Sequence, residues 1–232
     1  MTPLDLLRKF EDIYQAMFPA TINENDAFIW LSGIPHPLFN AVMHCKDKHF
    51  LQCLKQIEVQ TPLSFWDHSE NDSTIIETVK EKGFNFAAHC SLVSWDVKNF
   101  NSIKKGIISP AKMDDFKDIM KAVFHMNSSI LNQLIILMKN TDAENYLIYE
   151  KDKPIGTGTL IPFGKVGGVF NIAVLPEFQK KGYGTAIIEF LKQRAIELNI
   201  EKIILLTSSD GEKLYRKVGF KKALDVKIYV KT

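Results

Sequence analysis

The segment between Asn171 and Leu198 constrains the fold of this chain more than any other part of the sequence. An apolar run typical of a strand ends at Pro176, a polar loop containing Gly182 and Gly184 follows, and apolar residues then recur at helical spacing. Because proline lacks the amide that a continuing strand would use, strand pairing is expected to stop there. The segment is therefore predicted to be a strand, a loop and an amphipathic helix.

The loop has the properties of an anion site. Gly182 and Gly184 let the backbone turn so that successive N–H groups face one point. The loop also leads into a helix, whose dipole and unpaired first-turn amides favour phosphate oxygens. Lys180 and Lys181 add attraction for a ligand with several negative charges. A diphosphate group fits such a site.

Other phosphate-binding and catalytic signatures are absent from the sequence. A dinucleotide fingerprint starting at Gly182 would need Gly or Ala at position 187, where the chain has Ile187. The sequence also contains no G-x-x-x-x-G-K-S/T loop, no G-x-S-x-G elbow, no H-E-x-x-H motif and no deaminase zinc motif. These absences argue against a nicotinamide enzyme, a nucleoside triphosphatase and the common hydrolases and metalloenzymes.

Two motifs together resemble those of the GNAT superfamily of acyl-CoA-dependent N-acyltransferases. Residues 179–184 read Gln-Lys-Lys-Gly-Tyr-Gly and resemble the family's pyrophosphate loop, Q/R-x-x-G-x-G/A, which also follows a strand. Residues 214–220 read Leu-Tyr-Arg-Lys-Val-Gly-Phe and resemble the family's L-Y-x-x-x-G-F signature. The expected order of elements over residues 106–232 is similar too: two helices, three antiparallel strands, loop and helix, strand, helix and strand.

The resemblance implies an α/β fold of the α+β type, with a central mixed, largely antiparallel sheet flanked by helices. It also implies acetyl-CoA as cosubstrate and no metal. In the family, the strand before the loop pairs with the pantetheine arm of coenzyme A, and the loop amides hold its pyrophosphate. The residues that would take these roles here are Ile172, Ala173, Val174, Gln179, Lys180, Lys181, Gly182, Tyr183, Gly184 and Thr185. The amide of Val174 would also stabilise the thioester oxygen during attack.

Acetyl transfer to an amine requires a neutral amine and a proton for the departing thiolate. A lysine-like ammonium has a pKa of about 10.4, so its neutral form costs roughly 4 to 5 kcal/mol at pH 7. Many family members place a carboxylate on the strand before the loop, but residues 168–172 contain none. The sequence therefore identifies no base: a chain of waters, one of them oriented by Asn171, or desolvation of the substrate would take its place, and Glu177 is expected to face solvent. Tyr215 matches the family's general acid by its place in the second motif; the alternative is a buried ring whose hydroxyl bonds the backbone.

Residues 1–104 differ in composition from residues 105–232, which predicts two domains. The first part holds 9 Lys+Arg against 13 Asp+Glu and two of the 12 glycines, whereas the second holds 20 Lys+Arg against 14 Asp+Glu. The boundary is expected in the polar stretch Lys98–Lys105. Residues 105–232 would form the acetyltransferase domain and residues 1–104 a smaller α/β domain.

A Gly-Phe pair occurs near the end of residues 1–104 and again near the end of residues 105–232. Aligning the Gly-Phe pair at 83–84 with the pair at 219–220 puts Val79 opposite Tyr215. Residues 1–104 therefore lack a hydroxyl at the position of the expected general acid. We favour a degenerate GNAT-like half, as in tandem members of the superfamily. An unrelated α/β domain is the alternative.

Cysteine and hydropathy patterns favour a cytoplasmic protein without a metal. Cys45, Cys53 and Cys90 form no C-x-x-C pair, which argues against a disulfide framework and a zinc ribbon. Cys45, His49 and Cys53 would share one face of a helix, a spacing that suits a metal clip, but no fourth ligand is evident. The longest apolar stretch, near residues 130–138, is far shorter than the roughly 20 residues of a membrane-spanning helix, and the charged N-terminus argues against a secretory signal.

The leading hypothesis is an N-acetyltransferase that moves an acetyl group from acetyl-CoA to a primary amine by direct attack in a ternary complex. The alternative is a non-catalytic acyl-CoA sensor or interaction module, which the missing strand carboxylate favours. Nucleic-acid binding is disfavoured, because the lysines of the basic second part are spread over helix faces and turns without interleaved aromatic residues. The expected partner is a small-molecule or peptide amine, with no nucleic acid and no membrane, and we expect a monomer or homodimer.

Overall fold

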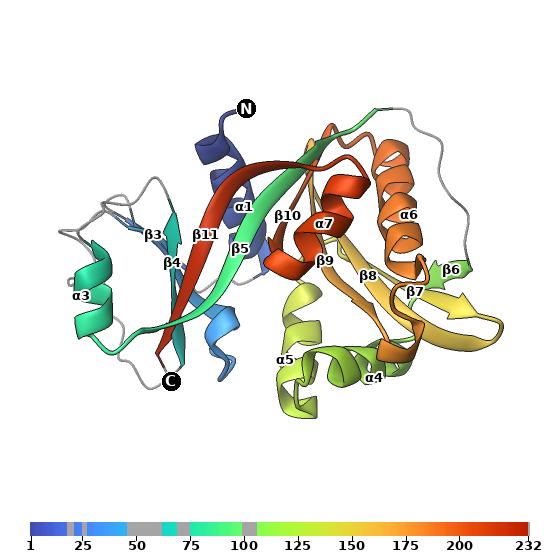
Figure 1. Cartoon of the computed structure of the whole chain (residues 1–232), viewed down its shortest axis with the longest axis horizontal. Coiled ribbons are helices and arrows are strands. Elements are labelled where there is room, and N and C mark those ends of the chain that lie inside the picture. Colours follow the sequence, from blue (N-terminus) through green and yellow to red (C-terminus); the bar gives the residue numbers. More distant parts are fainter. Residues whose placement is uncertain (18–20, 25–26, 46–61, 69–74, 99–105, 232) are drawn as a thin grey trace. The chain divides into compact units, whose positions relative to one another are not determined.

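The computed structural model describes residues 1–17, 21–24, 27–45, 62–68, 75–98 and 106–231 (Figure 1). Contacts divide the chain into two compact units. Unit 1 consists of Met1–Leu92, Leu206–Glu212 and Lys222–Thr232, and unit 2 of Val93–Leu205 and Lys213–Lys221. Both units are therefore discontinuous in sequence. Residues 99–105, where the domain boundary is expected, lie outside the described residues, and that boundary stays a prediction.

Unit 2 contains a mixed sheet with helices on both faces. Its elements are β6 (Ile107–Pro110), α4 (Met113–Phe124), α5 (Ser128–Met138), β7 (Glu144–Glu150), β8 (Lys153–Phe163), β9 (Val166–Val174), the 3-10 turn η2 (Pro176–Phe178), α6 (Tyr183–Glu197), and parts of β10 (Lys202–Ser208) and α7 (Ser209–Lys217). The strand order is β10-β9-β8-β7-β6, with β10 and β9 parallel and the other pairs antiparallel. This sheet confirms the predicted mixed, largely antiparallel α/β fold.

The two faces of this sheet carry separate apolar clusters. On β7, Ile148 packs in the cluster that includes Ile187 of α6, whereas its neighbour Leu147 packs in the cluster that includes Phe116 of α4 and Leu131 of α5. Successive side chains of a strand point to opposite faces, so one strand serves both layers. Helix α6 therefore covers one face, and α4 and α5 cover the other (Figure 1).

The chain before residue 98 completes the core of unit 2. The last residues of β5 (Asn85–Asp96) belong to this unit, and Val93 and Trp95 are buried in the cluster that includes the α6 residues. The N–H of Val97 donates to the carbonyl of Glu201 over 2.9 Å, which places the end of β5 beside the start of β10. The sequence provides no local signal for this contribution, because the two segments lie far apart in the chain.

Unit 1 also contains strands that run in mixed directions. Its elements are α1 (Pro3–Met17), β1 (Thr21–Glu24), β2 (Ala27–Leu31), the 3-10 turn η1 (Pro37–Phe39), β3 (Asn40–Cys45), β4 (Leu63–His68), α3 (Ile75–Glu81), most of β5 and most of β11 (Lys221–Lys231). The order is β1-β2-β3-β4-β11; β3 and β4 are parallel, and the other pairs are antiparallel. Unit 1 therefore combines helices and strands, and it includes β11 from the far end of the sequence; a separate domain of residues 1–104 stays a prediction.

The two Gly-Phe turns have the same local structure. Gly83 and Gly219 both have left-handed φ angles, of 86° and 91°. The N–H of Phe84 donates to the carbonyl of Val79 over 3.2 Å, and that of Phe220 donates to Tyr215 over 3.0 Å, the helix-ending bond of a Schellman motif. The two aligned turns therefore have the same backbone conformation. That the N-terminal part is a degenerate GNAT-like half stays a prediction.

Helix α1 buries one carboxyl group in unit 1. Glu11 is 7% exposed, and its Oε1 has no hydrogen-bond partner among the described residues. Burial raises the pKa of Glu11 to about 8, opposed by the nearby charge of Arg8 and reinforced by that of Asp12. Glu11 is therefore mostly protonated in the folded protein at neutral pH.

We expect this buried group to make stability depend on pH. A carboxyl with a pKa near 4.5 when unfolded and about 8 when folded stabilises the protein fully below the lower value, and that contribution is lost as the pH rises to the higher one. Over this range, the free energy of unfolding should fall by about 2–4 kcal/mol in the wild type but not in Glu11→Gln. Urea unfolding at both ends of the range measures this. Asp12→Asn, beside it on the helix, should keep most of the wild-type dependence, because burial is the largest cause of the raised pKa and the charge of Asp12 the smallest of the three; a Glu11→Gln variant that also keeps it would contradict the assignment.

Candidate functional site

Strands β9 and β10 pair over a short stretch. Their parallel ladder joins Lys202–Ile204 to Val166–Gly168, and among the described residues it ends there, although β9 continues to Val174. On the other side, β9 pairs with β8 over its whole length apart from a bulge. The second half of β9 is therefore outside the β10 ladder. A strand edge of this kind can accept an extended ligand through its main-chain groups.

A bulge interrupts β9 at this point. The register with β8 shifts so that Asn171 and Ile172 together lie opposite Gly158. Asn171 has a left-handed φ of 55°, which is uncommon for a residue other than glycine. The hydroxyl of Thr157 donates to the carbonyl of Asn171 over 2.7 Å and so holds the bulge. Such conformations concentrate at functional sites.

The side chain of Asn171 is oriented by a chain of hydrogen bonds. Its amide nitrogen donates to the hydroxyl of Thr159 over 3.1 Å, and that hydroxyl donates to Oδ1 of Asn145 over 2.7 Å. The oxygen of the Asn171 amide has no hydrogen-bond partner among the described residues. Asn171 therefore presents an acceptor of fixed orientation, and its partners Thr159 and Asn145 were missed from sequence because they lie on other strands.

The loop after β9 has the backbone of an anion site. Lys180 and Gly182 have left-handed φ angles of 58° and 88° and alternate with other conformations, the pattern that turns successive N–H groups to one side. No side chain caps α6, and no hydrogen bond to a described residue uses the N–H of Gly182, Gly184 or Thr185. The structure thus places unsatisfied amides at the helix N-terminus, as the sequence predicts.

The remaining residues predicted to bind the cofactor take different positions. The side chain of Gln179 donates to the carbonyl of Val174 over 3.0 Å and ties the loop to the strand. Ala173 and Val174 are buried, so only their main chains can serve a ligand. Ile172 packs against the α6 cluster. Tyr183 is buried as well, and its hydroxyl donates to a carboxylate of β7, so its ring is part of the protein core.

Two polar contacts attach α6 to β7. Arg194 donates to both carboxylate oxygens of Glu144 over 2.8 and 2.7 Å, and Tyr183 donates to Glu150. The guanidinium lowers the pKa of Glu144, while burial and the Glu144 carboxylate raise the pKa of Tyr146 to about 12. These contacts hold the helix whose N-terminus carries the loop amides. Sequence reasoning missed them, since each joins residues more than thirty positions apart.

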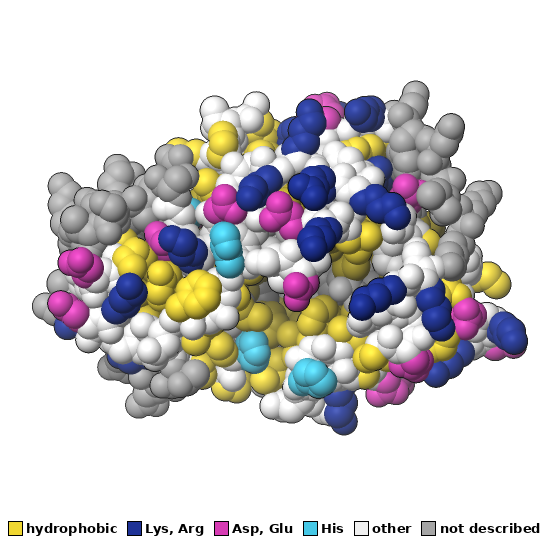
Figure 2. Space-filling model, in the orientation of Figure 1, with side chains coloured by type: hydrophobic (Ala, Val, Ile, Leu, Met, Phe, Trp, Pro, Cys, Tyr) yellow, Lys and Arg dark blue, Asp and Glu magenta, His cyan; other side chains and the backbone are white. Residues whose placement is uncertain are grey.

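Basic side chains lie on the loop after β9 and on α7. Lys180 and Lys181 of the loop are exposed, as are the basic residues of α7. Figure 2 shows Lys and Arg side chains gathered over α7 on the face in view. Glu177, expected to face solvent, is indeed exposed and pairs with Lys153 over 3.2 Å. The positive charge favours a phosphorylated ligand.

Tyr215 of α7 is 8% exposed, and its ring meets that of Phe220 edge to face with centroids 5.6 Å apart. Burial raises the pKa of the Tyr215 hydroxyl above its usual value. No described residue hydrogen bonds with this hydroxyl, so the alternative of a backbone-bonded tyrosine is not what the described part of the chain shows. The phenol stays protonated at neutral pH and has a proton to donate.

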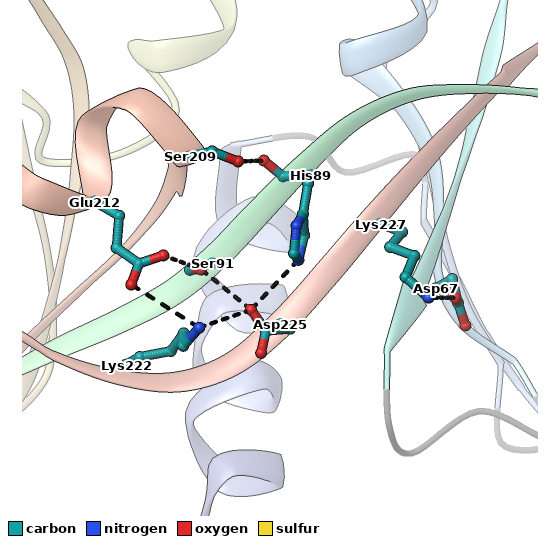
Figure 3. A network of polar contacts seen from close by, with 8 residues as sticks. All are labelled: Asp67, His89, Ser91, Ser209, Glu212, Lys222, Asp225 and Lys227. Carbon is teal, nitrogen blue, oxygen red and sulfur yellow. Dashed lines mark hydrogen bonds and ion pairs between the residues drawn. The ribbon is translucent and has the colours of Figure 1, made fainter.

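A polar network occupies part of unit 1 (Figure 3). Ser91 donates to Glu212 over 2.9 Å, and Lys222 lies 3.0 Å from Asp225 and 3.9 Å from Glu212. His89 lies 3.4 Å from Asp225. The Lys222 ammonium lowers the pKa of Asp225. Because Lys222 balances both carboxylates, we interpret the network as a structural connection between β5, β11 and the first turn of α7.

The described residues contain no group of three or more His, Cys, Asp or Glu side chains that could hold a metal ion. His49 and Cys53 of the suggested metal clip lie outside them. Cys90 is a free, buried thiol. No helix in the described ranges is long and apolar enough to cross a membrane.

Comparison with known proteins agrees with this geometry. Residues 112–220 match the model of the acetyltransferase (GNAT) family, which spans the bulge, the loop and Tyr215. Residues 112–220 therefore form a GNAT acetyltransferase domain, and the resemblance seen in the two motifs is confirmed. No curated protein matches the sequence.

Solved structures show the same fold at low sequence identity. A GCN5-related N-acetyltransferase from Kribbella flavida has a TM-score of 0.71 at 12% identity, covering 99% of this chain and 95% of that one. A functionally unknown conserved protein from Staphylococcus epidermidis has a TM-score of 0.69 at 20% identity, covering 91% and 93%. A GNAT-family acetyltransferase from Colwellia psychrerythraea has a TM-score of 0.58 at 12% identity, covering 100% and 98%.

Proposed function

We propose that this protein is an N-acetyltransferase that moves an acetyl group from acetyl-CoA to a primary amine by direct attack in a ternary complex. The observation that carries the proposal is the set of unsatisfied amides at the N-terminus of α6, directly after a strand whose second half is outside the neighbouring ladder. The amides suit a pyrophosphate and the strand edge suits a pantetheine arm. The family's general use of acetyl-CoA supports this choice of acyl donor.

Three groups of the chain would act on the reacting atoms. The amine nitrogen forms a bond to the thioester carbon while the carbon–sulfur bond breaks. The N–H of Val174, next to the open edge, would donate to the carbonyl oxygen. The free oxygen of Asn171 would accept a hydrogen bond from a water that takes the proton of the amine, and Tyr215 would give its proton to the departing thiolate.

We further propose that the acceptor is a small molecule or peptide amine, and that the protein acts in the cytoplasm as a monomer or homodimer without nucleic acid or membrane.

A panel of amines incubated with acetyl-CoA and the full chain tests the reaction through release of free thiol. Amine-dependent release is the expected result. Tight binding of acetyl-CoA without thiol release from any amine would favour the alternative, a non-catalytic acyl-CoA sensor, which the absence of a carboxylate on β9 supports.

Replacing Tyr215 with phenylalanine is expected to lower kcat by about 10²- to 10³-fold, because only the proton donor is lost. The affinity for acetyl-CoA, measured by calorimetry, should stay within about twofold, since the ring and its packing remain. Tyr146→Phe is the matched control: it also removes a hydroxyl from a buried tyrosine of unit 2, one that donates to Glu144 away from the loop. Unchanged turnover in Tyr215→Phe would remove Tyr215 from the mechanism.

A further inference from the structure

Helix α6 buries a lysine in the core of unit 2. Lys192 is 4% exposed, although lysine is rarely buried. Burial lowers the pKa of its ammonium, an effect that the nearby Glu189 carboxylate opposes and Lys98 reinforces. A charge in this position costs stability unless specific contacts compensate for it.

The ammonium of Lys192 makes two contacts that compensate for its burial. It donates a hydrogen bond to the carbonyl of Val218 over 3.0 Å. It also lies over the ring of Trp95, 4.3 Å from the centroid, within the range of a cation–π interaction. Lys192 thus joins α6 to β5 and to the turn that follows α7.

The turn that Lys192 contacts is the one that holds Tyr215. Val218 follows the last residue of α7, so its carbonyl lies beyond the helical hydrogen-bond ladder. The N–H of Val218 lies 3.2 Å from the carbonyl of Tyr215, and the N–H of Phe220 lies 3.0 Å from the same oxygen. The ring of Trp95 lies against the turn as well, 3.6 Å from the position that a Cβ of Gly219 would take. Fixing Val218 therefore fixes the main chain of Tyr215.

We propose that Lys192 is a positioning residue for the proposed reaction: through the Val218 carbonyl and the Trp95 ring, it sets the position of Tyr215 relative to α6, whose N-terminus carries the loop amides. This inference rests on the proposed function, since Tyr215 matters here as the proton donor. Lys192 is a part of the site that neither motif contains. A single side chain connects the helix that would bind the pyrophosphate to the residue that would protonate the thiolate.

Lys192→Met in the full chain tests the proposal, because methionine keeps most of the apolar stem and removes the ammonium. We expect kcat to fall by about 10- to 100-fold while the KM for acetyl-CoA stays within about twofold, since the loop amides are unaffected. Lys192→Arg keeps a cation that can donate to Val218 and lie over Trp95, and should recover most of the turnover. It also keeps the test valid if the methionine variant fails to fold.

Lys202→Met is the matched control. Lys202 pairs with Asp96 on the same strand as Trp95, so its loss also weakens a lysine contact to β5 but leaves Val218 untouched. We expect this control to keep the wild-type kcat. An equal loss of kcat in Lys192→Met and Lys202→Met, or a wild-type kcat in Lys192→Met, would overturn the proposal.

A spectroscopic readout separates this proposal from the proposed function. Tyrosine-ring NMR signals, with that of Tyr215 assigned from Tyr215→Phe, report its surroundings without any turnover. Lys192→Met should shift the Tyr215 signal and leave that of Tyr146, and Lys202→Met should shift neither. If the wild type acetylates no amine but these shifts occur, the reaction assignment fails and the connection stands. An unshifted Tyr215 signal in Lys192→Met overturns the connection even if the wild type is active.

Discussion

Replacing Gly182 with glutamate is expected to abolish binding of acetyl-CoA while the fold survives. The new carboxylate would stand at the amides that suit the pyrophosphate, and two like charges about 4 Å apart repel by roughly 4 kcal/mol at the effective dielectric near a protein surface. Calorimetry should show a loss of affinity of at least about 100-fold. Gly182 is exposed, so stability should fall only by the cost of a left-handed residue, about 1–2 kcal/mol.

Gly164→Glu is the matched control for this substitution. Gly164 also has a left-handed φ, of 58°, and a Cβ there would meet no atom within 4 Å. The control should show the same loss of stability and wild-type binding. Gly184 is less suitable for this substitution, because a Cβ added there would lie 3.3 Å from the side chain of Leu214, the residue before Tyr215. Tight binding of acetyl-CoA by Gly182→Glu would refute the loop assignment.

Truncating Trp95 to alanine is expected to cost about 3–5 kcal/mol, a large share of the roughly 5–15 kcal/mol that stabilises a typical domain. Trp95 is 3% exposed and contacts the Lys192 ammonium, the Phe220 ring and the Gly219 turn. Urea unfolding measures the loss. Turnover should fall as well, because this turn holds Tyr215.

Phe86→Ala is the control on the same strand, since Phe86 is 59% exposed, and it should cost under about 1 kcal/mol.

A fragment of residues 105–232 provides a second test. It lacks the β5 residues that complete unit 2, so we expect no cooperative unfolding transition. A fragment that unfolds cooperatively and binds acetyl-CoA would show that β5 is dispensable.

The predicted elements of the loop region agree with the structure because their signals are local. Pro176 ends the strand, and Gly182 has the left-handed conformation that glycine allows most easily. The position of Tyr215 follows from a motif of seven consecutive residues. The roles of these residues in binding and catalysis remain proposals.

The features that the sequence did not predict depend on distant parts of the chain. The left-handed conformation of Asn171 arises where β9 gains a residue against β8, and its orientation depends on Thr159. The contribution of β5 to unit 2 depends on a pairing across about a hundred residues. No short window of sequence contains either partner.

Sequence alone was enough to predict the strand, loop and helix between Asn171 and Leu198, because glycine, proline and helical periodicity act on the backbone within a few residues. The resemblance of two motifs indicated the family and the candidate proton donor. Only the tertiary structure decided that the Tyr215 hydroxyl bonds no described residue, that Lys192 lies under the turn after α7, and that residues before position 98 complete the core. These are contacts between segments, and they form only when the chain buries its apolar surface as a whole.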